Sequence, residues 1–298
     1  MIQGLERAGL LGRCLLIPPR PATERELLRC HTPQYLQRVQ DDILAGRDQL
    51  STGDTAISAH SERTARLAAG GVLAAVEAVM EGRVRQAFAV VRPPGHHASA
   101  TRGMGFCIYN NVAIAARHLQ AVHGLERILI VDWDVHHGNG TQDIFWRDPS
   151  VLFFSSHQAP FYPGSGTRLE RGEGPGAGFT CNCPLPAGTT GRQLLAAWRD
   201  GLVPLAEAFA PEFVLISAGF DSRGGDPLGD FRLEDRDFSA LTQLMLDIAA
   251  QSAQGRLVSV LEGGYDLEGL ASASAAHVAT LLGLAATAPD ATRASPHG

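Results

Sequence analysis

ILIVDWDVHHGNGTQ, residues 128–142, is the stretch that decides the fold. Four apolar residues, three of them β-branched, run directly into a cluster of acidic and histidine side chains. A short apolar run of this kind is typical of a strand buried on both faces of a parallel sheet. Polar side chains that follow such a strand lie at its carboxyl end, where open α/β sheets place their ligand sites. The stretch therefore predicts an α/β fold with a functional site at one edge of the sheet.

The same pattern recurs along the chain. Strands are predicted at residues 87–91, 127–131, 151–155, 213–217 and 257–261. An unusual polar segment follows each of them, in chain order RPPGHH, DWDVHHGN, SSHQ, AGFDS and EGGYD. Because the carboxyl ends of parallel strands meet at one edge, we expect these five loops to converge. Long Ala- and Leu-rich stretches between the strands predict helices on both faces of a single, doubly wound sheet.

Capping residues mark where the helices begin and end. Thr32 followed by Pro33 predicts the start of one helix, since threonine caps the first turn and proline suits its first position. A second helix is predicted over residues 111–123, with Gly124 as the residue that ends it. No internal repeat or low-complexity linker divides the chain, which predicts one domain.

Composition excludes several classes of protein. The formal net charge of −6 provides no basic surface for nucleic acid, so we expect no direct nucleic-acid partner. The five cysteines and the lack of a signal-peptide pattern favour a reducing cytoplasm, with Cys181 and Cys183 as packing thiols. The apolar segment 270–288 is interrupted by serine, histidine and threonine, so it predicts a packed helix and no membrane partner.

Asp132, Asp134 and His136 form a D-x-D-x-H pattern at the end of the quoted strand. Extended backbone has a side-chain period of two, so Trp133 and Val135 should point to the opposite side. Two carboxylates and an imidazole gathered there would repel and desolvate one another unless a cation compensates. Such a set suits a catalytic zinc or ferrous ion, whereas cysteine-rich sets suit structural zinc. The alternative is a buried salt-bridged network, but no arginine stands next to this cluster.

Asp221 is the candidate for a third metal ligand, because it follows the apolar run FVLIS and a flexible Ala-Gly pair. A lone aspartate at a strand end is more often a helix cap, but the D-x-D-x-H cluster at the same edge favours a ligand. His96 and His97 follow a turn set by Pro-Pro-Gly. They are either a structural pair or a catalytic one, and the neighbouring metal loop favours catalysis.

Six ordered motifs resemble the histone deacetylase family. They are RPPGHHA (92–98), GFCIYNNVAIAA (105–116), ILIVDWDVHHGNGTQ (128–142), PEFVLISAGFDS (211–222), DPLG (226–229) and LEGGYDL (261–267). The DWDVHHGN form, with Asn139, is most similar to the class II branch. The resemblance implies the arginase/deacetylase fold, with a catalytic domain over residues 1–285. The sequence ATAPDATRASPHG predicts a loose tail over residues 286–298. All 25 basic residues are arginine, and this composition favours a bacterial source.

The resemblance assigns the metal and the proton-transfer residues. Asp134, His136 and Asp221 match the family's zinc ligands, which implies one zinc ion per chain. His97 matches the general base, and His96 matches its electrostatic partner. The implied reaction is hydrolysis of an acetyl or other acyl amide on a lysine side chain, with an acetylated protein or peptide as the partner.

Three further residues complete the implied catalytic set. Asp132 matches the carboxylate that orients His96, and Asn139 stands where class I members carry a second such aspartate. Tyr265 matches the tyrosine that polarises the substrate carbonyl, and the Gly-Gly pair before it lets the backbone bring it close. Some relatives carry histidine in its place and are poor hydrolases, so the tyrosine predicts an active enzyme. A packed core aromatic is the alternative for this position.

The family also encloses the acyl-lysine chain in a tunnel. The matching positions are Gly105, Phe106, Tyr162 and Gly263, with Leu228 at the rim. Polyamine-specific members place a carboxylate near the Leu228 position to attract the distal ammonium group. An apolar rim therefore predicts a preference for acetyl-lysine peptides over acetylated polyamines.

The resemblance further implies a monovalent cation, usually potassium, near the zinc. By position this site would use Asp132, Asp134, His136, Ser155 and Ser156. A second cation site would map to Phe145, Asp148, Val151 and Phe179.

The chain departs from the family pattern at its start, because it begins after the position of the family's first strand and its H-P-E-x-P-x-R-like loop. We therefore expect the sheet edge, the internal product channel and one wall of the substrate cleft to differ. Three alternative functions remain. A dinuclear manganese ureohydrolase would need a D-x-D where the chain has Asp221 followed by Ser222, and counting bound metals distinguishes it. Acetylpolyamine deacetylation and a catalytically silent acyl-lysine-binding module are distinguished by turnover of acetylated substrates.

Overall fold

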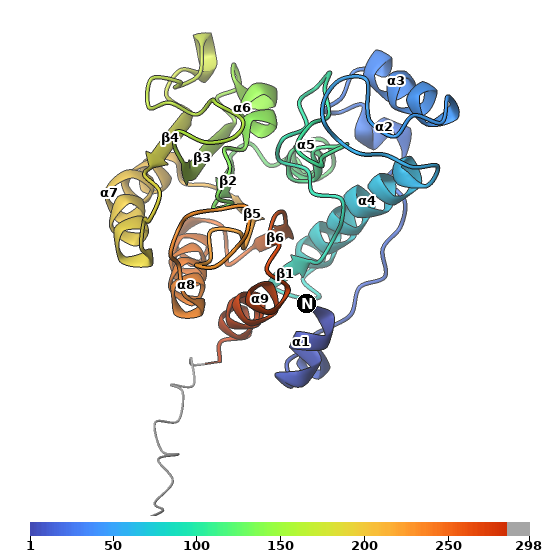
Figure 1. The fold of residues 1–298 in the computed structure, drawn as a ribbon. Coiled ribbons are helices and arrows are strands. Elements are labelled where there is room, and N and C mark those ends of the chain that lie inside the picture. The colour runs from blue at the N-terminus through green and yellow to red at the C-terminus, as the bar shows by residue number, and fades with distance from the viewer. Residues whose placement is uncertain (285–298) are drawn as a thin grey trace, which may run out of the picture.

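The computed structural model describes residues 1–284, and the tail predicted over 286–298 lies outside the described residues. Six parallel strands form one sheet in the order β1-β6-β5-β2-β3-β4 (Figure 1). They are β1 (Gln86–Ala89), β2 (Ile128–Asp132), β3 (Val151–Gln158), β4 (Thr180–Leu185), β5 (Phe213–Ala218) and β6 (Leu257–Leu261). The single parallel α/β sheet expected from the sequence is confirmed.

Helices cover both faces of this sheet, with α4 and α5 on one side and α7, α8 and α9 on the other (Figure 1). The helices are α1 (Ile2–Arg7), α2 (Glu24–Leu27), α3 (Pro33–Leu44), α4 (Ser61–Met80), α5 (Asn111–His123), α6 (Asn139–Phe145), α7 (Gly191–Phe209), α8 (Asp235–Ser252) and α9 (Leu267–Leu281). Short 3-10 turns lie at Leu11–Arg13 and Gly174–Gly176. Among residues 1–284, no helix is both long enough and apolar enough to cross a membrane.

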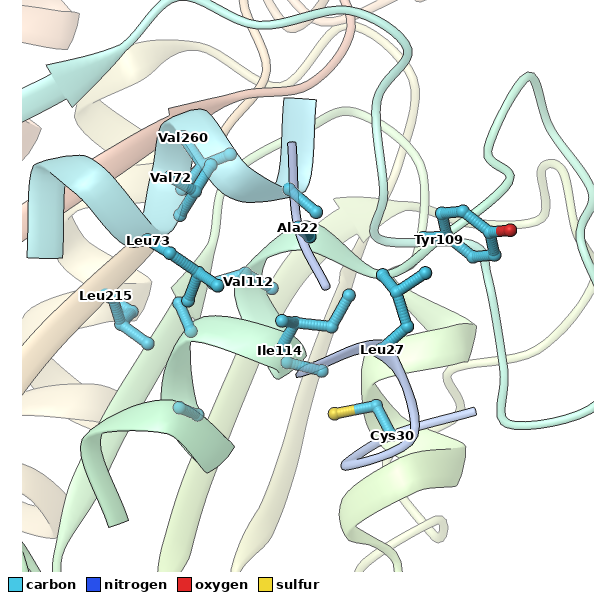
Figure 2. Packing of buried hydrophobic residues seen from close by; sticks show 14 of the residues in the cluster. Ala22, Leu27, Cys30, Val72, Leu73, Tyr109, Val112, Ile114, Leu215 and Val260 are labelled. Atoms are coloured by element: carbon cyan, nitrogen blue, oxygen red, sulfur yellow. The ribbon is translucent and has the colours of Figure 1, made fainter. Parts of the chain in front are cut away.

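Alternating side chains of the central strands supply two separate hydrophobic clusters. In β6, Leu257 and Leu261 are buried against α7, α8 and α9, whereas Val258 and Val260 are buried against α4 and α5. Figure 2 shows part of the α4–α5 cluster, including Val72, Leu73, Val112 and Val260. Each fully buried branched side chain stabilises the fold by roughly 1.5–3 kcal/mol relative to exposure. The continuous apolar runs in the sequence are thus explained by burial on both faces.

The helix boundaries follow the predicted signals. The Thr32 side chain accepts a hydrogen bond from Tyr35 N at the start of α3, and Pro33 occupies the first turn. Gly124 ends α5 with a left-handed backbone, φ 67°, which glycine adopts without steric cost. These two predictions are confirmed.

Strand β4 was not predicted from the sequence. It pairs with β3 at the edge of the sheet, and this pairing extends β3 to Gln158, three residues beyond its predicted end. Its sequence TCNCPL does not resemble a strand, because proline and asparagine disfavour sheets. An edge strand tolerates Pro184 because one side of its backbone needs no hydrogen-bond partner. Cys183 packs beneath α7 as a free thiol, as expected.

The opposite edge of the sheet is β1. A cavity of about 740 Å³ lies beside it. Its walls are mostly apolar and come from the first nineteen residues, α4, β1 and α9. This hollow is lined by none of the zinc-ligand or catalytic residues predicted from the sequence.

Candidate metal centre and active site

The loops after four strands meet at the carboxyl edge of the sheet. His96, after β1, contacts Asp132 at the end of β2, with 2.9 Å between Nδ1 and Oδ2. Val135 N, after β2, donates to Oδ1 of Asp221, after β5, at 2.9 Å. Gly263 N, after β6, donates a hydrogen bond to Asp134 Oδ2 in the loop after β2 at 2.8 Å. The convergence expected from the sequence is confirmed for these loops.

Asp134, His136 and Asp221 form a compact donor cluster. One ligand atom from each lies within 4.8 Å of the other two; Asp134 and Asp221 are fully buried, and the His136 side chain is 12% exposed. His136 Nδ1 lies 2.9 Å from Asp134 Oδ1 and 3.3 Å from Asp221 Oδ2. Asp221 Oδ2 nevertheless has no hydrogen-bond partner of acceptable geometry among the described residues. A buried carboxylate oxygen without a partner is costly, and a divalent cation at this point would satisfy it.

The charges of this cluster are strongly coupled. Burial, and then the nearby Asp134 carboxylate, raises the pKa of Asp221 to about 7. Burial alone would lower the pKa of His136, but the hydrogen bond to Asp134 and the nearby Asp221 carboxylate outweigh burial and raise this pKa to about 10. The two carboxylates therefore favour positive charge at the imidazole, and a divalent metal ion bound by two carboxylates and one histidine would supply positive charge at the same point. These residues fit a catalytic divalent metal.

The backbone of the D-x-D-x-H segment differs from the prediction. Strand β2 ends at Asp132, and residues 134–136 form a bend instead of continuing as extended chain. The bend arises because Asp134 N donates to Asp132 Oδ1 and His136 N donates to Asp134 Oδ1, at 3.1 and 2.9 Å. Aspartate commonly closes turns in this way. Trp133 and Val135 are still buried on the α7–α8 side, so the predicted division of side chains holds although its cause was wrong.

His96 and His97 lie side by side with different partners. Their ring centroids are 4.0 Å apart. His97 Nδ1 donates to Asn139 Oδ1 at 2.8 Å, which leaves Nε2 of His97 free to accept a proton. Burial lowers the pKa of His97, and the neighbouring His96 lowers it further. Burial would also lower the pKa of His96, but Asp132 and Asp134 outweigh it and hold this pKa well above its ordinary value.

Tyr265 stands beside the metal-ligand cluster. Burial, together with the nearby carboxylates of Asp221 and Asp134, holds the pKa of its hydroxyl well above its ordinary value, so the group stays a proton donor. Its backbone N–H donates to Asp226 Oδ2 at 2.7 Å, and its ring lies 5.9 Å from that of Phe106. The loop thus holds a protonated tyrosine next to the donor cluster.

Two glycines allow this close packing. A methyl group added to Gly263 would lie 1.9 Å from Asp221 Oδ2, which is far inside van der Waals contact. A methyl group added to Gly105 would lie 2.3 Å from Cδ2 of His97, and the backbone there has φ +55°. Both positions of the predicted tunnel set therefore need glycine because the site leaves no space for a side chain.

The remaining predicted substrate-contact residues surround the same groups. The Tyr162 ring lies 5.2 Å from that of His97 and 6.1 Å from that of His136. Leu228 is 39% exposed, and its backbone N–H donates to the same Asp226 carboxylate that holds Tyr265. Their role as walls and rim of a substrate site stays a prediction.

Sequence reasoning missed Glu262, the first residue of the EGGYD loop. It is fully buried, and burial raises its pKa to about 7. Oε2 accepts hydrogen bonds from Gly95 N at 2.6 Å and from His96 N at 3.1 Å, while Oε1 accepts from Ser217 Oγ at 2.9 Å. The available signal was a charged residue placed directly after a strand that is buried throughout.

Two residues near Tyr162 were also missed. Asp54 is exposed and accepts hydrogen bonds from Gly105 N at 2.7 Å and from the Tyr162 hydroxyl at 3.0 Å. Phe161 stacks on His136, with ring centroids 5.3 Å apart and an interplanar angle of 21°. Asp54 lies over fifty residues away from its partners in the sequence, and no local pattern links it to them.

Comparison with known proteins identifies the family. The histone deacetylase domain matches residues 1–281. This chain belongs to the histone deacetylase family. Among its relatives, "Polyamine deacetylase HDAC10" of Mus musculus is 46% identical over 294 residues, which cover 95% of this chain and 43% of the relative. "Histone deacetylase 15" of Arabidopsis thaliana is 42% identical, over 94% of this chain and 50% of the relative. A "Probable deacetylase" of Archaeoglobus fulgidus is 41% identical, over 86% of this chain and 71% of the relative.

A solved structure of the family confirms the fold. The crystal structure of the HDA15 HD domain superposes with a TM-score of 0.89 at 41% identity, covering 94% of this chain and 80% of the other. This chain spans less than half the length of the HDAC10 relatives. The similarity to these relatives thus extends over the domain that carries the donor cluster.

The positions expected to hold potassium are also brought together in this histone deacetylase domain. Ser155 pairs in register with Asp132, and Ser156 Oγ donates to Asp132 O at 3.5 Å. For the second site, Phe179 O accepts from the backbone two residues beyond Val151. Asp148 already pairs with an arginine, so a cation there would depend on backbone carbonyl groups. Both cation sites stay predictions.

A second group of possible metal ligands, Glu77, His118 and His123, joins α4 to α5. His123 Nε2 lies 3.0 Å from Glu77 Oε1, and His118 Nε2 is bonded to the same oxygen. Arg29 donates to His118 Nδ1 at 2.6 Å, which places the histidine proton on Nε2, the nitrogen that a metal would require. We interpret this group as a hydrogen-bonded link between two helices.

Proposed function

We propose that this chain is a zinc-dependent hydrolase that removes acetyl groups from lysine side chains, with one zinc ion held by Asp134, His136 and Asp221. The observation that carries the proposal is the buried donor cluster, in which Asp221 Oδ2 lacks a hydrogen-bond partner among the described residues. Family membership supports the deacetylase reaction. A single cluster of two carboxylates and one histidine at this edge disfavours a dinuclear ureohydrolase.

Proton transfer falls to the histidine pair. When bound, zinc supplies a Lewis acid and lowers the pKa of water in contact with it. His97, neutral and with Nε2 free, accepts the proton of the attacking water and returns it to the departing lysine nitrogen. Asn139 holds the tautomer that this role needs, and His96, held by Asp132, supplies positive charge next to the reacting groups.

Charge on the acetyl oxygen is stabilised by Tyr265. Its hydroxyl stays protonated and donates a hydrogen bond as the carbonyl oxygen becomes negative. The bond from Tyr265 N to Asp226 fixes the loop, so the donor needs no reorganisation during the reaction. The rings of Phe106 and Tyr162 lie against Tyr265 and His97, where they suit the methylene chain of acetyl-lysine.

The proposed substrate class is argued from the residues at the rim of the predicted substrate site. Leu228 is apolar and partly exposed beside the Tyr265 loop, which suits the apolar stem of acetyl-lysine in a peptide. Acetylpolyamine hydrolysis is the second candidate. It is supported by the relatives named polyamine deacetylases and by the exposed Asp54 carboxylate, which could attract a distal ammonium group. An ion pair at a partly desolvated rim contributes on the order of 1–3 kcal/mol, enough to change preference at least tenfold.

The test is a comparison of kcat/KM for acetyl-lysine peptides and N-acetylputrescine, using purified protein of known zinc content. We expect the peptides to be preferred, and Leu228→Glu to move the ratio towards the polyamine while Asp54→Asn moves it away. A higher kcat/KM for N-acetylputrescine than for every peptide tested would overturn the substrate class. Absence of turnover with every acetylated substrate would favour the silent binding module instead.

We further propose that potassium occupies the Ser155–Ser156 site next to the zinc, because the residues implied by the family lie together there. A cytoplasmic location is also proposed. It is supported by the five cysteines, all in the described part of the chain and all free thiols.

A further inference from the structure

Glu262 lies between the two halves of the proposed catalytic machinery. It directly follows β6 and opens the loop that carries Tyr265. Its side chain points away from that loop to the one that carries His96 and His97, where it meets two backbone N–H groups. The mechanism described above gives this buried carboxylate no role.

The side chain of Glu262 contacts the loop after β1 and strand β5. Its Oε2 atom accepts from the consecutive N–H groups of Gly95 and His96, at 2.6 and 3.1 Å. Oε1 accepts from the hydroxyl of Ser217 in β5, at 2.9 Å. Two consecutive N–H groups directed at one oxygen fix the orientation of the peptide unit between them. The carboxylate therefore sets the backbone from which the His96 and His97 side chains project.

The backbone of the same segment fixes the other half of the site. Glu262 N donates to Ala218 O at 3.2 Å, and Gly263 N donates to Asp134 Oδ2 at 2.8 Å. Tyr265 follows two residues later. One short segment thus holds the histidine loop through the Glu262 side chain and the tyrosine loop through its own backbone.

We propose that Glu262 is a positioning residue that fixes the separation between the general base His97 and the oxyanion donor Tyr265. The inference rests on the proposed function, because it matters only if these two groups act on one substrate. Reacting groups must be held in a near-attack arrangement, and a misplacement of about 1 Å can cost about 10²-fold in rate. The role depends on hydrogen-bond acceptors at fixed places rather than on the negative charge itself.

Substitution of Glu262 by glutamine or by alanine distinguishes the need for hydrogen-bond acceptors from the need for negative charge. In Glu262→Gln, the amide oxygen can accept from both N–H groups while the amide nitrogen donates to Ser217 Oγ. In Glu262→Ala, the three donors lose their acceptor. Val258→Ala, on the same strand, is the matched control, because it leaves a cavity in the α4–α5 cluster and removes no hydrogen-bond acceptor.

The experiment measures kcat, KM, zinc content and melting temperature for the three variants and the parent protein on one acetyl-lysine peptide. We expect Glu262→Ala to keep its zinc and its KM within about threefold while kcat falls about 10²-fold, as expected for misplaced reacting groups. Glu262→Gln should recover at least about tenfold of that loss, and Val258→Ala should lose melting temperature with kcat within about twofold of the parent.

Two results would overturn the inference while leaving the proposed function intact. One is a parent-like kcat in Glu262→Ala, and the other is a Glu262→Gln variant as slow as Glu262→Ala, which would assign the effect to charge. An inactive parent protein with full zinc occupancy would instead refute the proposed function on which the inference rests.

Discussion

At the scale of single residues, the histidine pair gives the clearest division of roles. We expect His97→Ala to lower kcat at least about 10²-fold, as for loss of a general base. His96→Ala should cost less, because His96 acts through its charge and is held by Asp132 without touching the transferred proton. Both variants should keep their zinc, measured by elemental analysis beside steady-state kinetics. Equal losses in the two variants would contradict the assignment.

The hydroxyl of Tyr265 is tested by Tyr265→Phe, which removes one oxygen atom and keeps the ring against Phe106. We expect kcat to fall about 10²–10³-fold with zinc retained, as for loss of an oxyanion donor. Tyr162→Phe is the comparison, since that hydroxyl bonds to Asp54 and faces no developing charge, and it should cost far less. Normal turnover by Tyr265→Phe would show that the assigned role is wrong.

At the scale of secondary-structure elements, a strand could be predicted from the sequence when both its faces were buried. Strand β6 was predicted to the residue, because both its faces are buried and four of its five residues are apolar. Strand β4 was not predicted, because an edge strand needs hydrogen-bond partners on one side only and therefore tolerates the proline and asparagine in its sequence. The bend after Asp132 was missed for a different reason: side-chain-to-backbone hydrogen bonds compete with extended structure over only three residues.

The end of α5 offers a test of backbone conformation free of packing effects. A methyl group added to Gly124 would meet no atom within 4 Å, so the left-handed φ of +67° alone opposes it. We expect Gly124→Ala to lower the free energy of unfolding by about 1 kcal/mol. Gly201→Ala, inside α7 and with only ordinary contact to Phe154, should raise it by about 0.5–1 kcal/mol. Urea unfolding at neutral pH measures both, and shifts of the same sign would contradict this reading.

At the scale of the whole molecule, buried neutral histidines should set the acid limit of stability. Burial lowers the pKa to about 4 in His31 and His157 and to about 3 in His137 and His277. The unfolded chain, with histidine pKa near about 6.5, binds more protons between these values. The stabilisation is therefore complete above about pH 6.5 and is lost as the pH falls towards 4, by up to about 1.4 kcal/mol per pH unit for each histidine.

This pH dependence is measured by urea unfolding of the zinc-loaded protein between pH 7.5 and 5. His277→Asn is the matched variant, because His277 is fully buried between Thr242 and Ser259, away from the metal cluster. We expect this variant to be less stable at pH 7 but to lose stability less steeply below pH 6.5. An unchanged slope would show that His277 does not stay neutral in the folded protein.

Across the molecule, the donor residues were predictable from sequence because strand ends carry them. Asp134 and Asp221 both follow apolar runs, so parallel strands had to bring them to one edge. Glu262 and Asp54 were not predicted, since their roles depend on contacts between segments distant in sequence. The metal-donor residues could thus be predicted from the sequence, whereas the hydrogen bonds that hold the site in place could be found only from the three-dimensional structure.

The central claim is that Asp134, His136 and Asp221 hold one catalytic zinc ion. The most direct test is zinc content per chain, measured by elemental analysis with turnover of an acetyl-lysine peptide, in the parent protein and in Asp221→Ala. The account predicts one zinc ion per active parent chain and loss of both zinc and turnover in the variant, because too few donors remain. Two ions per parent chain, or full zinc occupancy in Asp221→Ala, would contradict it.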